Sequence, residues 1–379
     1  MDFSPSPEHE AFRRVVRDFA EAEIVPRAAE WDRSAELPLE VVRKMGDLGL
    51  FGLPFPEEYG GSGASFATFC IAVEEIARAD SSMAITLEAA VGLGANPINR
   101  FGTAEQKARW LPDLLAGRAL AAFGLTEPDA GSDAGATRTR AQQDGGEWVL
   151  NGEKAFITNS GTAITSLVTV TALTGPDEIS SFIVPADTPG LMVGPGYHKM
   201  GWRGSDTHPV RLEDCRVPAD AILGERGQGF RQFLSILDEG RIAIAAMSVG
   251  VARACFDHSL AYAKQREAFG KPIGANQAVA FRIADIHVAI EAAQLLTYRA
   301  AWLRDSGKDH RAAAAIAKLY ASEAAVTASR HATQIFGGAG FIDDTPVSRL
   351  YRDAKVLEIG EGTSEIQRLL ISRDLGLPV

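Results

Sequence analysis

The sequence predicts a mainly α-helical fold with a central antiparallel β domain. Three observations indicate this fold class. Residues 1–120 carry apolar side chains at helical spacing, residues 121–225 contain short Val- and Thr-rich runs between turn residues, and residues 226–379 contain long helical segments. We therefore expect an N-terminal α-helical domain (1–120), a middle β domain (121–225) and a C-terminal four-helix-bundle domain (226–379).

The N-terminal part is expected to hold three helical stretches. The first covers Glu8 to Glu30, because its apolar residues recur close to a helical period, and a shorter one covers Leu39 to Leu48. Prolines and glycines at positions 54–63 then interrupt the pattern. Helical spacing resumes from Phe66 to Ala79.

Residues 121–225 are typical of a small, mostly antiparallel sheet. Glu147–Ile157 is expected to form two short strands around a hairpin turn at Asn151-Gly152. Ser166–Thr174 and Ile179–Val184 are further strands joined by a turn at Gly175-Pro176-Asp177, and His208–Pro218 is one more.

The C-terminal part carries four helical signals, which suggests an antiparallel bundle. Three are long: Phe230–Lys264, Ala278–Asp305 and Arg311–Phe336, the last with Asp309 as a possible cap and Gly337-Gly338 as a stop. A fourth helix is expected at Ser364, where Gln367 three residues later fits a capping box.

Composition narrows the class of protein. The 379 residues carry 38 basic and 49 acidic side chains, a net charge of −11, which argues against a nucleic-acid-binding surface but leaves room for a small basic pocket. Cys70, Cys215 and Cys255 lie far apart and give no disulfide framework or zinc spacing, so a reducing compartment fits.

No targeting or membrane segment is expected. The first residues, M-D-F-S-P-S-P-E, lack the apolar core of a signal peptide, and the longest apolar stretch, Ile242–Ala252, is too short to span a bilayer. We therefore expect a cytoplasmic protein without a membrane partner.

Several common motifs are missing from the sequence. No G-x-G-x-x-G follows a strand, and no G-x-x-x-x-G-K-[ST], H-E-x-x-H or G-x-S-x-G occurs. Rossmann, P-loop, metal-hydrolase and serine-hydrolase chemistry are therefore poorly supported, and no metal site is expected.

Three stretches allow both a functional and an ordinary structural interpretation. The polar, glycine-containing run Ala122–Asp133 suits a phosphate or a heterocycle edge, but also an ordinary loop. Arg266–Pro272 could hold an anionic aromatic ligand, or its basic residues could simply complement a helix dipole. Glu361, between Gly360 and Gly362, is either a reactive carboxylate or a solvated charge at a helix start.

Together, these stretches resemble the acyl-CoA dehydrogenase family, flavoproteins that oxidise acyl-CoA thioesters, and the resemblance covers nearly the whole chain. Six motifs carry it, in the family's order: Leu125–Asp133, Asn151–Asn159, Lys199–Thr207, Arg266–Lys271, Gln334–Phe341 and Glu361–Arg368. The resemblance implies a β-barrel-like middle domain, FAD bound between the middle and C-terminal domains, and a homotetramer in which FAD also touches a neighbouring subunit.

The resemblance also implies roles for individual residues. Cofactor contacts are expected from Phe123, Leu125, Thr126, Ser132, Phe156, Thr158, Thr363 and Glu365, with Thr158 near flavin N5. Contacts to the adenosine-diphosphate half of a partner subunit's FAD are expected from Arg266, Phe269, Gln277, Gln334, Gly337 and Gly338. Substrate contacts are expected from Ser132, Asp238, Arg241, Gly360 and Gly362.

Glu361 matches the family's catalytic base. Some relatives place the base just before the arginine that Arg241 matches, but here that position is Gly240, which has no side chain to act. The implied reaction yields a trans-2-enoyl-CoA: Glu361 removes the α proton, FAD N5 accepts the β hydride, and a backbone N–H with a ribityl hydroxyl stabilises the thioester oxygen. Burial would raise the pKa of Glu361 and the helix dipole would lower it, and the sequence leaves that balance open.

One departure from the family bears on the substrate. The family often has tyrosine before the base, whereas this chain has Gly360, which favours a short, branched or bulky acyl group. The segment Leu237–Ala243 indicates the short-chain and short-branched-chain subgroup. The expected electron acceptor is an electron-transferring flavoprotein in fatty-acid β-oxidation. Alternatives are a flavin oxidase or a dehydrogenase of another, non-CoA substrate on the same fold, and a non-catalytic helical scaffold.

Overall fold

The structure, a computed structural model, describes residues 6–379. Residues 1–5, on which the expectation of no signal peptide partly rests, lie outside the described residues. The first part of the chain is helical: α1 (Pro7–Glu23), α2 (Ala28–Ser34), α3 (Leu39–Asp47), α4 (Phe66–Ala79), α5 (Ser81–Glu88), α6 (Asn96–Phe101) and α7 (Ala104–Leu115), with short turns η1 (Leu50–Gly52), η2 (Glu57–Tyr59) and the π-helical η3 (Ala89–Ala95).

The first expected helix is wrong in its extent. Glu8–Glu30 forms two helices, because α1 ends at Glu23 and Pro26 interrupts the chain before α2 begins. The other two predicted stretches agree with α3 and α4 to within a residue.

The middle part forms one sheet: β1 (Leu120–Gly124), β2 (Arg140–Asp144), β3 (Glu147–Thr158), β4 (Thr165–Gly175), β5 (Glu178–Pro185), β6 (Leu191–Val193), β7 (Thr207–Pro218) and, after η4 (Ala219–Ala221), β8 (Ile222–Leu223). The strand order is β6-β7-β3-β2-β4-β5-β8, with β1 paired to β4. Most pairs are antiparallel, as expected, and β1–β4 and β2–β4 are parallel.

The predicted hairpin at Asn151-Gly152 is wrong. β3 runs unbroken from Glu147 to Thr158, and the turn between β2 and β3 lies at Gly145-Gly146. At Gly152 the pairing with β7 shifts register, and a Cβ there would lie 2.4 Å from Thr139 Oγ1. Gly152 therefore permits a close approach of two backbones at a bulge.

The C-terminal part comprises α8 (Gly229–Gln265), the hairpin β9 (Glu267–Ala268) and β10 (Lys271–Pro272), η5 (Ile273–Ala275), α9 (Gln277–Asp305), α10 (Arg311–Phe336), η6 (Gly337–Phe341), α11 (Pro346–Ala354), η7 (Lys355–Glu358) and α12 (Ser364–Asp374). The three long helices match their predictions, while α11 was not expected. The side chain that caps α12 is Thr363, whose Oγ1 accepts from the Ile366 N–H at 3.3 Å, rather than Ser364, which is already helical.

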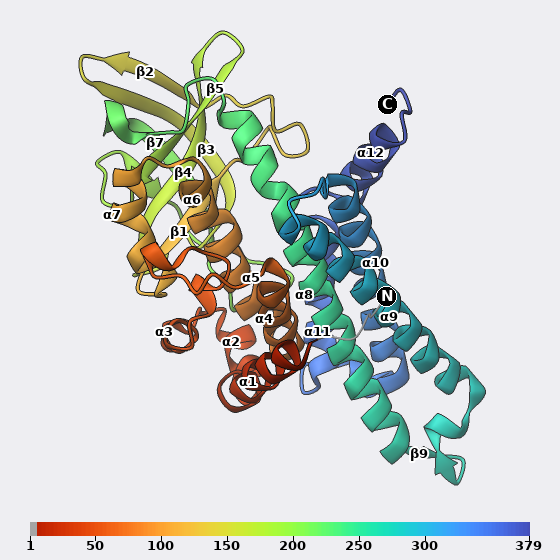
Figure 1. Ribbon diagram of the computed structural model, residues 1–379. Helices are drawn as coiled ribbons and strands as arrows, with labels where there is room; N and C mark the ends of the chain where they lie inside the picture. The colour runs from red at the N-terminus through yellow and green to blue at the C-terminus, as the bar shows by residue number, and fades with distance from the viewer. Residues whose placement is uncertain (1–5) are drawn as a thin grey trace.

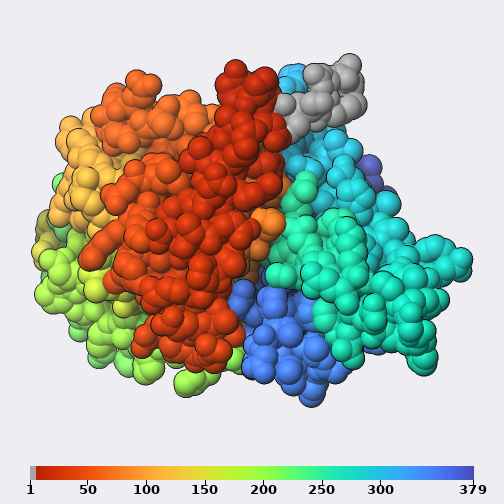
Figure 2. Space-filling model, turned by 90° about the horizontal axis from the view of Figure 1, so that it is seen from below, coloured from red at the N-terminus to blue at the C-terminus, as the bar shows by residue number. Residues whose placement is uncertain are grey.

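The three parts meet along α8. Figure 1 shows this helix running from beside the sheet to the β9 hairpin at the opposite end of the molecule. Figure 2 shows the N-terminal helices lying between the sheet on one side and the C-terminal helices on the other. One large core joins the helical parts to one side of the sheet and contains the buried Ile242–Ala252 of α8. The sheet has a second core, and a small third cluster joins α8, α9 and α10.

The predicted fold class is confirmed: two helical parts flank a central sheet. The elements change type close to residues 120 and 225, but the three domain ranges themselves stay predictions. No helix within residues 6–379 is long and apolar enough to cross a membrane.

Candidate active site

Glu361 lies in the loop between η7 and α12 and points into the protein. Its backbone is left-handed (φ 53°), as is that of Gly362 (φ 95°), so two consecutive residues turn the chain sharply. Both carboxylate oxygens are buried, and neither has a hydrogen-bond partner among the described residues. Burial raises the pKa of Glu361 to about 7. Burial therefore outweighs the neighbouring Glu88, Arg241 and Lys318, which all lower this pKa, and the carboxylate suits a base at neutral pH.

The two neighbouring glycines differ in what they contribute. Gly362 adopts a backbone conformation that favours glycine. Gly360 does not, and a Cβ there would meet only the Val356 carbonyl oxygen, at 3.6 Å. A larger residue would fit the backbone at position 360, so the absence of a side chain there leaves space beside Glu361.

Helix α8 lies against the Glu361 carboxylate at a glycine. A Cβ on Gly240 would lie 1.9 Å from Glu361 Oε2, so this position has to be glycine for the carboxylate to lie where it does. Asp238 and Arg241, both predicted substrate residues, form an ion pair on the same helix. Burial lowers the pKa of Arg241 and raises that of Asp238, and Arg241 Nε has no partner among residues 6–379. The structure thus brings Asp238, Arg241 and Glu361 together.

Two residues that the sequence reasoning missed hold the loop. Lys318 of α10 is fully buried, and its Nζ donates to the Gly362 carbonyl oxygen at 2.8 Å. Gln367 Nε2 donates to the same oxygen at 2.8 Å. Burial lowers the pKa of Lys318 to about 8. In the sequence, the feature that could have pointed to Lys318 was a single cationic residue at the end of an alanine-rich run.

A second buried carboxyl, Glu88, was also missed. It ends α5, directly before the π-helical turn η3, and both its oxygens lack partners among the described residues. Burial, and then the neighbouring Glu361, raise the pKa of Glu88 well above its usual range. A Cβ on Gly92 would lie 2.6 Å from Glu88 Oε1, so this glycine makes room for the carboxyl. In the sequence, the feature that could have pointed to Glu88 was a single acidic residue within an apolar stretch.

The predicted flavin-ring residues Thr126, Phe156 and Thr158, which we call the flavin-ring group, gather at the end of β3. The Ala155 N–H donates to the Thr126 carbonyl oxygen at 2.9 Å and ties the Leu125–Asp133 loop to the strand. A bulge turns Phe156 outward (φ 60°, 64% exposed), and its ring packs against Tyr197 at 5.1 Å. Thr158 follows two residues later, half-buried.

A buried ion pair fixes this loop. Lys154 Nζ lies 2.8 Å from Glu127 Oε1, and burial lowers the pKa of Lys154 to about 8. Glu127 also accepts hydrogen bonds from the Thr137 and Thr139 hydroxyls, and its pKa falls to about 2: burial raises it, but Lys154 and the hydrogen bonds more than offset this. The pair holds Thr126 beside β3.

Contacts connect this group to the Glu361 group. Asn159 Nδ2 donates to the Thr86 carbonyl oxygen of α5 at 3.1 Å, and Phe123 stacks on Phe233 of α8 at 4.1 Å between ring centroids. Leu125 is buried in the same region, whereas Ser132 is exposed on the loop. Thr363 caps α12 directly after the base, and Glu365 is exposed on that helix.

The remaining predicted cofactor residues lie elsewhere. Phe269, 97% exposed, is at the turn of the β9–β10 hairpin, beyond the end of α8. A small apolar cluster joins the ends of α8 and α10 to the start of α9. This cluster brings together the exposed residues Arg266, Phe269, Gln277, Gln334, Gly337 and Gly338. One chain does not bring this group to the flavin-ring group, because the hairpin and the sheet lie at opposite ends of the molecule (Figure 1).

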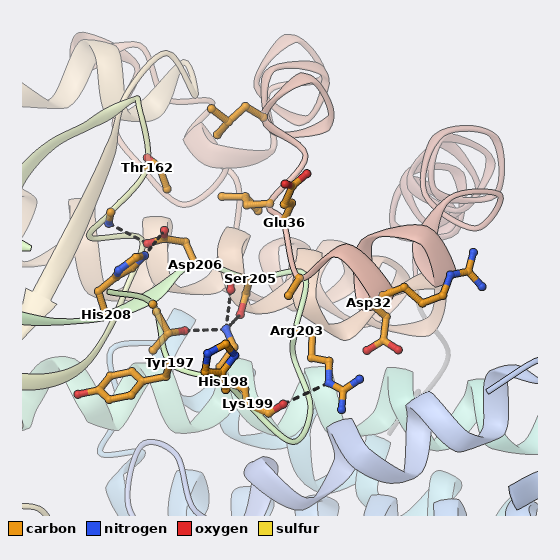
Figure 3. A pocket seen from close by; sticks show the side chains of 17 residues that line it. Asp32, Glu36, Thr162, Tyr197, His198, Lys199, Arg203, Ser205, Asp206 and His208 are labelled. Carbon is orange, nitrogen blue, oxygen red and sulfur yellow. Dashed lines mark hydrogen bonds and ion pairs between the residues drawn. The ribbon is translucent and has the colours of Figure 1, made fainter. Parts of the chain in front are cut away.

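A cavity of about 670 Å³ lies between the α2–α3 connection and the Lys199–His208 segment (Figure 3), and it adjoins the flavin-ring residues through Tyr197, whose ring packs on Phe156. None of the predicted site residues lines it. His208 Nε2 lies 2.8 Å from Asp206 Oδ1, and Lys199 donates to Ser205 and Thr207. These polar groups satisfy one another, so we do not place the reaction there. Within residues 6–379 no cluster of His, Cys, Asp or Glu is arranged to hold a metal ion.

The residues near the end of β3 fit a flavin. Phe156 presents an exposed ring, and the Thr126 and Thr158 hydroxyls have no hydrogen-bond partner among the described residues. An aromatic face with free hydroxyls beside it suits a planar heterocycle with polar edges. FAD would supply the hydride acceptor here.

Comparisons with known proteins identify the family of the chain. The family models of the acyl-CoA dehydrogenase N-terminal, middle and C-terminal domains match residues 6–118, 122–215 and 227–376. A probable acyl-CoA dehydrogenase of Bacillus subtilis is 51% identical over 99% of this chain and 100% of its own length. The human mitochondrial short-chain specific acyl-CoA dehydrogenase is 45% identical over 97% and 90%.

A solved structure gives the same result. Butyryl-CoA dehydrogenase from Megasphaera elsdenii superposes with a TM-score of 0.96 and 40% identity, covering 99% of this chain and 100% of that one. The three family models together with these relatives cover nearly the whole chain. The chain therefore belongs to the acyl-CoA dehydrogenase family and is an FAD-dependent oxidoreductase of acyl-CoA.

Proposed function

We propose that this enzyme converts a short or branched acyl-CoA to its trans-2-enoyl-CoA, with Glu361 as the base that removes the α proton. One observation carries the proposal: the Glu361 carboxylate is buried against Gly240 without a donor, with a pKa raised to about 7. Such a carboxylate is both ionisable at neutral pH and desolvated, so it can accept a proton from a weak carbon acid.

A small acyl group is supported by two features. The relatives described above include short-chain specific and butyryl-CoA enzymes. In this chain the buried Glu88 occupies space next to the base, and a polar carboxyl is a poor neighbour for a long apolar chain. Gly360 leaves lateral space, which suits a branch near the reacting carbons.

Assembly as a homotetramer is part of the proposal. The six cofactor residues around the β9 hairpin lie apart from the flavin-ring group, so they would serve the FAD of a partner subunit. Helix α9 also exposes four large apolar residues spaced seven apart, which lie on one face: Phe281, Val288, Leu295 and Trp302. A second copy of the chain would cover this face.

The roles of Asp238, Arg241, Thr126 and Thr158 in binding substrate and flavin belong to the same proposal. So do an electron-transferring flavoprotein as electron acceptor, a place in β-oxidation and a cytoplasmic location. Anaerobic reduction with slow oxygen consumption would support a dehydrogenase, and rapid oxygen consumption with substrate would instead indicate an oxidase.

The test is anaerobic bleaching of the bound flavin. The purified enzyme would be mixed with straight acyl-CoAs from butyryl to palmitoyl and with isobutyryl-, 2-methylbutyryl- and isovaleryl-CoA. We expect fast bleaching by a short or branched member and none in Glu361→Gln. Glu358→Gln, three residues earlier and paired with Lys355 at the surface, is the matched control and should bleach normally. Preference for palmitoyl-CoA, or bleaching of Glu361→Gln at the normal rate, would contradict the proposal.

A further inference from the structure

Two carboxyl groups from distant parts of the chain, Glu88 of α5 and Glu361, face each other in the interior. All four of their oxygens are buried and lack a hydrogen-bond donor among the described residues. Two glycines make the arrangement possible, since a Cβ on Gly92 would collide with Glu88 and one on Gly240 with Glu361. Space is thus provided on both sides for a carboxyl pair.

The nearby cations are not shared equally between the two acids. Arg241 pairs with Asp238, and Lys318 donates to the Gly362 carbonyl oxygen. Both cations act on Glu361 and lower its pKa, against the effect of burial. Among residues 6–379, the only charged neighbour that affects the pKa of Glu88 is Glu361 itself. This part of the chain therefore offers Glu88 no positive charge to stabilise an ionised form.

Two buried carboxylates in contact cannot both be ionised without a large cost. One proton on the pair removes this conflict and also creates the donor that both groups lack. The proton belongs on Glu88, because the cations favour charge on Glu361. Neutral Glu88 can then donate to the Glu361 carboxylate beside it.

We propose that Glu88 remains protonated and donates a hydrogen bond to the ionised Glu361, which makes Glu88 a positioning residue for the base. This inference rests on the proposed role of Glu361. During the reaction the α proton of the substrate moves to Glu361, and Glu88 keeps its own proton throughout. Glu88 would fix the direction of the Glu361 carboxylate and stabilise its ionised form.

The proposal fixes the sign of two pH effects. Glu88→Gln keeps a donor of the same shape, so the midpoint of the pH–rate profile for flavin bleaching should stay nearly unchanged. Glu88→Leu removes the donor, so the midpoint should move upward by roughly one pH unit, which slows bleaching about tenfold below it. If Glu88 were ionised instead, Glu88→Gln would remove a like charge and move the midpoint downward, and that result would overturn the proposal.

A second readout does not depend on turnover. Infrared difference spectra of the FAD-loaded enzyme would be recorded at slightly alkaline pH, with Glu88→Gln and Glu361→Gln each subtracted from wild type. We expect the carbonyl stretch of a protonated, buried carboxyl, lost in Glu88→Gln and retained in Glu361→Gln. Loss of that band in Glu361→Gln alone would refute the assignment.

Thr86→Val is the matched structural control. Thr86 is buried on the same helix, and its hydroxyl donates only to the Ser82 carbonyl oxygen within the described chain. Its variant should leave both the pH midpoint and the infrared band unchanged. Should Glu361→Gln still bleach, the proposed base is wrong, but the infrared assignment of the proton on Glu88 is decided separately.

Discussion

Replacing Gly240 with alanine tests whether the position of the Glu361 carboxylate sets the rate. The new Cβ would lie 1.9 Å from Glu361 Oε2, whereas ordinary contact begins near 3.4 Å, so the carboxylate has to move by about 1.5 Å. Misplacement of a reacting group by about 1 Å can cost on the order of 100-fold in rate. We therefore expect flavin bleaching to slow by about 100-fold in Gly240→Ala.

Stability should change little in this variant. The colliding atom is the end of a flexible side chain, and alanine in a helix is better than glycine by roughly 0.5–1 kcal/mol. Gly250→Ala in the same helix is the contrasting control, because its Cβ would lie 2.2 Å from the Glu74 backbone carbonyl oxygen. That variant should lose stability instead, by about 1–3 kcal/mol.

The assay is stopped-flow bleaching with butyryl-CoA, together with FAD content and thermal unfolding. A Gly240→Ala enzyme that binds FAD normally and bleaches within about threefold of wild type would refute this view of the base, since 1.5 Å of displacement has to cost more than that. Gly146→Ala, at an open turn of the sheet, controls for the substitution itself.

Four further outcomes are expected. Because the pKa of Glu361 rises from 4.5 unfolded to about 7 folded, its ionisation destabilises the fold as pH rises through that window. Glu361→Gln should therefore have a larger free energy of unfolding than wild type above neutral pH, by at most about 3 kcal/mol, and should unfold at a higher temperature. The difference should vanish near pH 4.5, the pKa of the unfolded state. Lys318→Met should move the pH–rate midpoint upward, because Lys318 lowers the pKa of Glu361; an unchanged midpoint would argue against that coupling. Lys154→Met leaves the buried Glu127 carboxylate without its cation and should cost about 3–5 kcal/mol in chemical denaturation, a loss that adding Glu127→Gln reduces. Leu295→Glu should give smaller particles in sedimentation and a lower FAD content, and an intact assembly would exclude the α9 face as the interface.

The pattern of the sequence predicted the large elements well. The three long C-terminal helices and three strands of the middle sheet, β4, β5 and β7, begin and end within a few residues of expectation, because helical and strand periods are local properties. The short strands β1, β2, β6 and β8 were not expected. The wrongly predicted hairpin arose because a glycine was interpreted from its sequence neighbours alone, whereas its role is a contact with a distant part of the chain. Gly152 looked like a turn, yet it serves a close contact with Thr139, which the local sequence does not reveal.

The candidate base was also predictable, since Glu361 lies in a motif that the family resemblance singled out. Its chemical state was not. Whether a carboxyl is desolvated, and which charges face it, depends on groups brought together from α5, α8 and α10.

The sequence by itself thus determined the fold class and the family, and it singled out Glu361 as the candidate base. Only the tertiary structure decided that Glu88 and Lys318 are its neighbours and that Gly240 makes room for it. It also separated the residues around the β9 hairpin from the flavin-ring group within one chain. The physical reason is the same in each case: packing joins residues that are distant in sequence, and the energy of a buried charge depends on those neighbours rather than on its own segment.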